Sequence, residues 1–343
     1  MLGFPREFLI DSLATKIVFG FSVVATSLGV GCDARTDKDV SRKSARHTAP
    51  TAAPSIVGEA DVAPRLLYLP DGDDVAYGSE FVPIERERPA ELRPKAKLCP
   101  PDMVDVAGSI CNDRYEAHLL DSKSGKALSP YYPPEPGLAR RLRDHWAHEQ
   151  ASVDGQLGRE LEIPQLPEFQ LSGKVELIAV ASVNVVPSGY VDGLVAESAC
   201  KNAGKRLCKP SEWVTACRGE KNQQFPYGDK YVQGACNVFR EAHPAQLLHG
   251  NASEGHLDPR LNLVASGTGP LLRLTGETRT CRSAWGNDAV FDMVGNLDEW
   301  VDDENGAFHG GFYARSTKLG CDARISSHPR PYEDYSLGVR CCK

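Results

Sequence analysis

The chain has 343 residues, of which 41% are hydrophobic and 25% charged, and its formal net charge at pH 7 is −7. This length is sufficient for one large domain or two small ones with a substantial hydrophobic core. The acidic balance, without any basic run interleaved with aromatic residues, argues against a nucleic-acid partner. Eleven cysteines are many for a reducing compartment, and none forms a Cys-x-x-Cys pair typical of zinc sites or redox dithiols. We therefore predict an oxidising location.

Residues 1–31 have the features of a signal peptide. Their apolar run, residues 17–30, is too short to span a bilayer comfortably. The run ends in Leu-Gly-Val-Gly before Cys32, which resembles the lipobox of bacterial lipoproteins, where the cysteine becomes the lipid-bearing first residue of the mature chain. We expect Cys32 to anchor the protein in the cell envelope, at the inner or the outer membrane. The alternative is cleavage and secretion, which leaves an odd cysteine.

Residues 32–98 are predicted to be mostly a disordered tether behind the lipid. Residues 33–63 are rich in Ala, Thr, Ser, Pro and charged residues and have few large apolar side chains to bury. Such a flexible chain of ~30 residues spans on the order of 30 Å. Residues 65–85 contain two apolar runs around a turn signal, a pattern as consistent with a hairpin as with a mobile segment.

The globular domain is predicted to begin at Cys99 and to extend over residues 99–343. Apolar and polar residues alternate from Cys99 to Val106, and Gly108 follows. This pattern predicts two strands joined by a turn, which would bring Cys99 close to Cys111.

An insertion at about residues 137–160 is predicted to be helical. Leu138, Leu142 and Trp146 recur every fourth residue, which indicates an amphipathic helix. His145 and His148 also lie there with a spacing that suits a metal pair. Because no third ligand is evident, we favour a solvated helix face.

Two further helices are predicted at residues 190–202 and from Pro210 to Gly219. The first should end at Gly204, and the second should begin with a proline, which is favoured in a first helical turn. Residues 240–276 are predicted to be loop, with surface histidines at positions 243, 249 and 256.

Residues 290–301 combine apolar residues, a turn signal and three carboxylates. The pair Gly295-Asn296 tolerates positive φ and should bend the chain between two short extended segments. Carboxylates on both sides of the bend and inward-facing carbonyls would form the hard oxygen cage that Ca²⁺ prefers. The predicted structural calcium ligands are Asp292, Gly295, Leu297 and Glu299. The alternative is a pair of solvated carboxylates.

This stretch, Asp-Met-Val-Gly-Asn-Leu-Asp-Glu-Trp, resembles the core motif of the formylglycine-generating enzyme family, also called the sulfatase-modifying factor family. Further matches follow in the family's order at residues 204–213, 225–228, 310–311 and 338–341. The resemblance covers roughly residues 99–343. It implies an α+β fold, a variant of the C-type lectin fold with short strands, two main helices, much irregular structure and disulfide cross-links.

The resemblance also implies two disulfides, Cys200–Cys341 and Cys217–Cys321. Because Cys341 and Cys342 are adjacent, a bond between them would be strained and each should have a distant partner. The remaining pairs, Cys208–Cys342, Cys236–Cys281 and Cys99–Cys111, are assigned by elimination.

Copper chemistry, in contrast, is not expected. In the formylglycine-generating enzymes, two cysteines shortly after a Gly-Gly-Ser motif bind copper, and Cu(I) prefers such sulfur ligands. Here residues 312–320 after Gly310-Gly311 contain no cysteine. Phe312 replaces the serine of that motif, and Asp298 replaces the tryptophan before the Glu-Trp pair. We predict that this chain does not produce formylglycine, and we assign no catalytic residue.

The predicted function is therefore a lipoprotein whose domain is a non-catalytic binding or scaffold module. Its partner would be an envelope protein or a small ligand. The alternative is an oxidoreductase of the same family with different chemistry. Because aromatic residues and arginine dominate recognition surfaces, we predict an exposed ligand surface at Trp285, His309, Phe312, Tyr313 and Arg315. The alternative for these residues is core packing.

Overall fold

The computed structural model describes residues 99–239, 242–267, 269–315 and 317–343. The signal peptide, Cys32, the tether and the segment at residues 65–85 lie outside the described residues. Within the described ranges, no helix is both long enough and apolar enough to cross a membrane.

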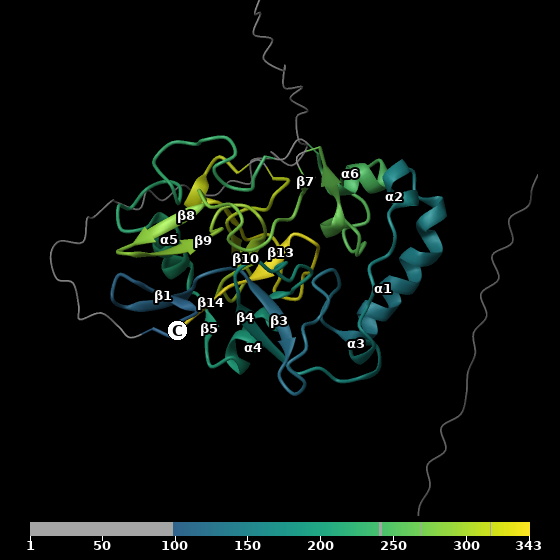
Figure 1. Cartoon of the computed structure of the whole chain (residues 1–343), viewed down its shortest axis with the longest axis horizontal. Coiled ribbons are helices and arrows are strands. Elements are labelled where there is room, and N and C mark those ends of the chain that lie inside the picture. Colours follow the sequence, from purple (N-terminus) through teal and green to yellow (C-terminus); the bar gives the residue numbers. More distant parts are fainter. Residues whose placement is uncertain (1–98, 240–241, 268, 316) are drawn as a thin grey trace, which may run out of the picture. The chain divides into compact units, whose positions relative to one another are not determined.

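The described residues form a mixed α and β fold of short elements, as predicted (Figure 1). The helices are α1 Pro136–Glu149, α2 Gln156–Glu160, α3 Glu168–Ser172, α4 Gly193–Asn202, α5 Pro210–Arg218 and α6 Pro244–His249, with 3₁₀ turns η1 Gln150–Ser152, η2 Leu261–Leu263 and η3 Gly320–Asp322. The strands are β1 Met103–Val106, β2 Ile110–Asp113, β3 Ala117–Asp121, β4 Leu177–Ala181, β5 Arg206–Leu207, β6 Ala265–Ser266, β7 Gly269–Pro270, β8 Arg282–Trp285, β9 Asp288–Phe291, β10 Asp298–Trp300, β11 Phe308–His309, β12 Arg324–Ile325, β13 Leu337–Val339 and β14 Cys341–Cys342.

Two four-stranded sheets organise the domain, with strand orders β1-β2-β14-β5 and β12-β11-β10-β13. In the second sheet, β10 is antiparallel to β11 and parallel to β13, so that Glu299 lies opposite His309 on one side and Gly338 on the other. Figure 1 shows β10 and β13 at the centre of the domain. Residues far apart in the sequence therefore converge on β10.

The helix predictions are confirmed for α5 and largely for α4. The α5 helix begins at Pro210, as predicted, and ends at Gly219, whose φ is 67°. The α4 helix begins at Gly193 rather than at Tyr190, because the Asp192 side chain accepts a hydrogen bond from the backbone amide of Val195 and so caps the helix there.

The prediction of loop from residue 240 to 276 was wrong for α6, for the η2 turn and for the two-residue strands β6 and β7. Pro244 starts this six-residue helix, which buries Leu248 and His249, so His249 is not a surface residue. A helix this short has too few turns to produce a periodic pattern in the sequence.

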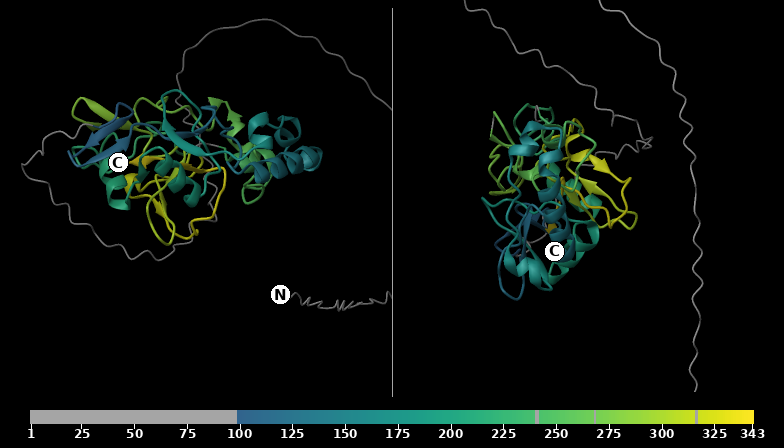
Figure 2. Two further views of the ribbon diagram at one scale, coloured as in Figure 1. Left: turned by 90° about the horizontal axis from the view of Figure 1, so that it is seen from below. Right: turned by 90° about the vertical axis from the view of Figure 1, so that its right-hand side faces the viewer.

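The predicted insertion forms α1, η1 and α2 along one side of the domain (Figure 1, Figure 2). Buried Arg260 connects α2 to the rest of the domain. Its guanidinium donates to the carbonyl oxygens of Gly158 and Leu161 and pairs with Asp258 at 2.6 Å. On α1, only Ala139 is fully buried, and His145 and His148 are exposed. The preference for a solvated helix face over a metal pair therefore agrees with the exposure of both histidines.

All five predicted disulfides are confirmed: Cys99–Cys111, Cys200–Cys341, Cys208–Cys342, Cys217–Cys321 and Cys236–Cys281. Three of them close loops with sequence separations of 104 to 141 residues, which restrict the unfolded chain strongly. Together they pair every cysteine of the described residues.

Candidate functional site

The bend between β9 and β10 forms the centre of the candidate site. Gly295 and Asn296 both have positive φ, 82° and 62°, as the sequence predicted. A side chain at Gly295 would lie 2.3 Å from the carbonyl oxygen of Asn237, so only glycine fits this close backbone approach.

The side chain of Asn296 holds the bend in place. Its amide nitrogen donates to the Glu116 carboxylate at 2.5 Å, and its oxygen accepts from the Asn237 side chain at 2.9 Å and from the Arg273 backbone at 3.0 Å. Glu116 also accepts from the Leu297 backbone amide at 2.9 Å. The bend is therefore fixed by side chains contributed from distant parts of the sequence.

Glu299 is buried and fully engaged. Its two oxygens accept hydrogen bonds from the Arg340 guanidinium at 2.7–2.9 Å and from the Trp213 indole at 2.6 Å. Arg340 is itself fully buried and donates further to the backbone carbonyls of Asp113 and Phe291. This geometry satisfies both members of a buried ion pair, as burial requires.

Acidic groups nevertheless outnumber basic groups around Arg340. Burial raises the pKa of Asp292 to about 7 and, together with the neighbouring Asp292 and Glu299 carboxylates, raises the pKa of Glu116 well above its ordinary value. One guanidinium thus faces three buried carboxylates. Such a cluster accommodates either a proton or an added cation.

Two of the four predicted calcium residues, Asp292 and Glu299, belong to this carboxylate cluster. Carboxylate and carbonyl oxygens are chemically suitable Ca²⁺ ligands. Both oxygens of Glu299 already bind Arg340 and Trp213, and Asp292 accepts from the Gly276 backbone amide at 2.6 Å. Among the residues that the structure describes, no three His, Cys, Asp or Glu side chains are grouped as metal ligands. Bound calcium would therefore have to exchange existing hydrogen bonds, and the site remains a prediction.

The double glycine after β11 passes close to the core. Gly310 and Gly311 have φ of 101° and 74°, and a side chain on Gly310 would lie 2.8 Å from the carbonyl oxygen of Met293. The preceding residue, His309, is buried, and its ring lies 5.0 Å from that of Trp213. Neither imidazole nitrogen has a hydrogen-bond partner among the described residues. Burial, with a contribution from Arg324, lowers the pKa of His309 to about 4, so the ring is neutral at pH 7.

An ion pair occupies the position where the resemblance would place copper chemistry. Asp298 is buried and accepts from the Arg315 guanidinium at 2.6 Å and from the Gly311 backbone amide at 2.8 Å. Burial raises the pKa of Asp298 to about 6, although Arg315 opposes that rise. The Arg315 guanidinium carbon also lies 5.0 Å from the centre of the Phe312 ring. No thiolate is present in this segment to bind copper.

The predicted exposed surface was wrong for three of its five residues. His309, Phe312 and Tyr313 are all buried, because His309 packs against Trp213 and the other two belong to a core cluster with Tyr335. Trp285 is half-buried with its indole nitrogen donating to the Ala216 carbonyl, and only Arg315, 34% exposed, presents a charged group to solvent.

Sequence reasoning also missed partners of the site. Glu116 and Arg340 lie within the motifs Asp-Arg-Tyr-Glu and Gly-Val-Arg-Cys, yet neither motif shows that the two side chains share one buried cluster. Asn237 and Arg273 have no motif of their own. Only the folded chain brings these residues together.

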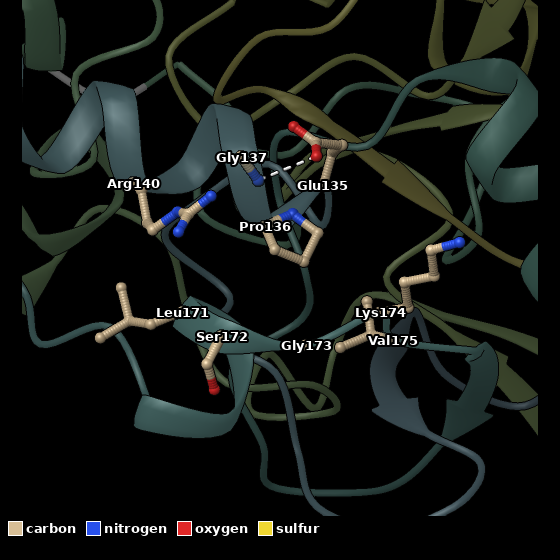
Figure 3. A pocket seen from close by; sticks show the side chains of 9 residues that line it. All are labelled: Glu135, Pro136, Gly137, Arg140, Leu171, Ser172, Gly173, Lys174 and Val175. Atoms are coloured by element: carbon tan, nitrogen blue, oxygen red, sulfur yellow. Dashed lines mark hydrogen bonds between the residues drawn. The ribbon is translucent and has the colours of Figure 1, made fainter.

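A separate open pocket of about 350 Å³ lies between the start of α1 and the end of α3 (Figure 3). Arg140 and Lys174 are its basic residues, while the Glu135 carboxylate caps α1 by accepting from the Gly137 amide at 2.8 Å. Its lining residues are Glu135, Pro136, Gly137, Arg140, Leu171, Ser172, Gly173, Lys174 and Val175. The one acidic side chain of this lining, Glu135, is therefore already used to cap the helix.

A comparison with known protein families agrees with the sequence resemblance. Residues 177–343 match the model of the sulfatase-modifying factor enzyme 1-like domain. Among curated proteins, no sequence relative matches. PvdO from Pseudomonas aeruginosa is a similar solved structure, with 15% identity, a TM-score of 0.32, and coverage of 70% of this chain and 82% of PvdO. CarF has 12% identity and a TM-score of 0.29, with 68% of this chain and 85% of CarF covered. The major tropism determinant I1 variant has 12% identity and a TM-score of 0.37, with 71% of this chain and 53% of the determinant covered.

Proposed function

Because residues 177–343 form a sulfatase-modifying factor enzyme 1-like domain, we propose that this chain is an exported, non-catalytic binding module of the cell envelope. The ten cysteines of the described residues all lie in disulfides, which supports this proposal most directly. Copper(I) requires soft ligands such as thiolates, and a disulfide sulfur carries no negative charge. The described residues therefore do not fit a thiolate copper site.

The ion pair between Asp298 and Arg315 supports the same proposal. It places a carboxylate and a guanidinium beside the double glycine, because Asp298 binds both Arg315 and the Gly311 backbone amide. A fixed guanidinium suits recognition of a ligand better than activation of oxygen. The domain thus keeps the family's scaffold and uses it for binding.

Attachment to the membrane through Cys32 completes the proposal. Five disulfides require an oxidising compartment, which agrees with export. Lipid on Cys32 would hold the domain at the envelope. If Cys32 were not lipidated, the same domain would be secreted. A Cys32→Ser variant should therefore move from the membrane fraction to the soluble fraction, and unchanged fractionation would refute the anchor.

A calcium ion at Asp292, Gly295, Leu297 and Glu299 is proposed only as a structural element. Its support is the grouping of three buried carboxyl groups, Glu116, Asp292 and Glu299, around the single guanidinium of Arg340. The ion would supply positive charge to that cluster, and Asp292 and Glu299 would hold it.

Copper loading tests the proposal of a non-catalytic module. The purified mature protein is mixed with Cu(I) in competition with a chromophoric chelator, and oxygen uptake is followed with a thiol peptide. A formylglycine-generating enzyme serves as the positive control. We expect neither stoichiometric copper retention nor oxygen uptake. Stoichiometric copper or iron with oxygen consumption would instead support an oxidoreductase with different chemistry.

A further inference from the structure

Three of the five exposed large hydrophobic residues among the described ranges gather in one place. Tyr231, Val232 and Leu319 are 37%, 53% and 55% exposed, whereas the other two, Val183 and Leu194, belong to other segments. Single exposed hydrophobic residues are normal on a protein surface, but a cluster of them marks an interaction site.

Buried Phe225 joins the two segments that carry this cluster. Its ring centre lies 6.2 Å from that of Tyr231, and Gly320 is packed so closely on the ring that an added Cβ would lie 2.8 Å from it. On the same segments, the Gln224 carbonyl accepts from the Cys321 amide at 2.9 Å. Residues 224–232 and 319–321 therefore lie side by side.

The Tyr231 ring also packs edge-on against Phe239 at 4.9 Å, and the Phe239 amide donates to the Arg315 carbonyl. The Tyr227 hydroxyl accepts from the Val232 amide at 3.1 Å, which fixes the loop that carries Tyr231 and Val232. The exposed cluster is thus an apolar surface whose Tyr231 ring packs on Phe225 and Phe239, beside the segment that carries Arg315. A side chain held by such packing loses little conformational entropy when a partner binds.

Lysines outnumber unpaired carboxylates around this cluster, although the whole chain is acidic. Lys230 and Lys318 directly adjoin Tyr231 and Leu319 in the sequence, are exposed, and form no salt bridge within the described part of the chain. Of the nearby carboxylates, Asp322 is engaged by Arg218 at 2.6 Å, and exposed Asp229 accepts from the Gln224 backbone amide at 3.3 Å. Two unpaired cations beside an apolar surface complement a partner with acidic and apolar side chains.

We propose that Tyr231, Val232 and Leu319, flanked by Lys230 and Lys318, form a docking surface for an acidic polypeptide segment that carries apolar side chains. The apolar residues of the partner would cover Tyr231, Val232 and Leu319, and its carboxylates would pair with the two lysines. This inference rests on the proposed binding function and specifies the chemistry of the partner.

Selection from a displayed library of random peptides on the full mature protein tests the proposal. We expect the selected peptides to combine Asp or Glu with Phe, Leu or Trp. A labelled consensus peptide should bind at least about tenfold more weakly to the Val232→Asp/Leu319→Asp and Lys230→Glu/Lys318→Glu variants, as measured by fluorescence anisotropy.

The matched control is Val183→Asp/Leu194→Asp, which changes equally exposed apolar residues elsewhere and should bind like the wild type. Because all the altered residues are exposed, the melting temperatures of the variants should stay close to that of the wild type. Failure to select any peptide, selected peptides without acidic residues, or equal weakening by the control would each overturn the proposal. None of these outcomes would be evidence for copper-dependent catalysis. The measurements of copper retention and oxygen uptake test that activity independently.

Discussion

Replacing Asp292 by Asn removes one negative charge from the buried cluster around Arg340 and leaves its shape nearly unchanged. Asn tolerates the positive φ of 58° at this position and keeps an oxygen that can accept from the Gly276 amide. The substitution therefore isolates the cost of ionising Asp292.

The pKa of Asp292 gives the size and sign of this cost. Burial raises it from 3.8 to about 7, so the folded protein binds a proton more readily than the unfolded chain between those two pH values. Stability contributed by the neutral carboxyl is consequently lost as the pH rises from about 4 to about 7. A shift of three units corresponds to about 4 kcal/mol.

Urea unfolding of wild type and Asp292→Asn from pH 4 to pH 8, in the presence of a chelator, measures the difference. We expect the two proteins to be equally stable near pH 4 and the variant to be more stable by up to about 4 kcal/mol near pH 8. A variant less stable than wild type at pH 8 would refute the reasoning. If calcium occupies the site, added Ca²⁺ will raise the melting temperature of the wild type but not that of the variant.

Three further predictions concern other parts of the site. Burial lowers the pKa of His309 to about 4, so the wild type should lose about 3 kcal/mol of unfolding free energy as the pH falls from 6.5 to 4, and His309→Phe should not. Equal acid sensitivity of both proteins in urea unfolding would contradict this. Arg315→Met should destabilise the fold by about 1–3 kcal/mol by leaving Asp298 unpaired, and adding Asp298→Asn should restore most of the loss; a double variant as unstable as the single one would refute the pairing. Replacing both Cys217 and Cys321 by Ala should cost about 4–5 kcal/mol, because their disulfide closes a loop with a sequence separation of 104; a change below about 1 kcal/mol in chemical denaturation would contradict this.

Local signals in the sequence were sufficient to predict much of the scaffold. Pro210 and Gly219 delimit α5, and Gly295-Asn296 forms the predicted bend, because each depends mainly on its own backbone preferences. The disulfide pairs were predictable because the family resemblance fixed two of them, and adjacency excluded a bond between Cys341 and Cys342.

The surroundings of the site were less predictable, because they depend on contacts between distant segments. His309 and Phe312 were expected at the surface, where aromatic residues often bind ligands, but they are buried against Trp213 and Tyr335. Likewise, the calcium prediction considered Glu299 without Arg340, which lies 41 positions away in the sequence and binds both of its oxygens. Composition and periodicity do not report such pairings.

Counting free thiols in the unreduced protein tests the absence of a copper-binding thiolate pair most directly. The mature protein is treated with an alkylating reagent, once folded and once in denaturant, and its intact mass is measured. We predict no alkylation in either state if Cys32 carries lipid, and alkylation of Cys32 alone if it does not. Alkylation of two further cysteines in the folded protein would contradict the account and indicate a thiolate pair that is available for copper.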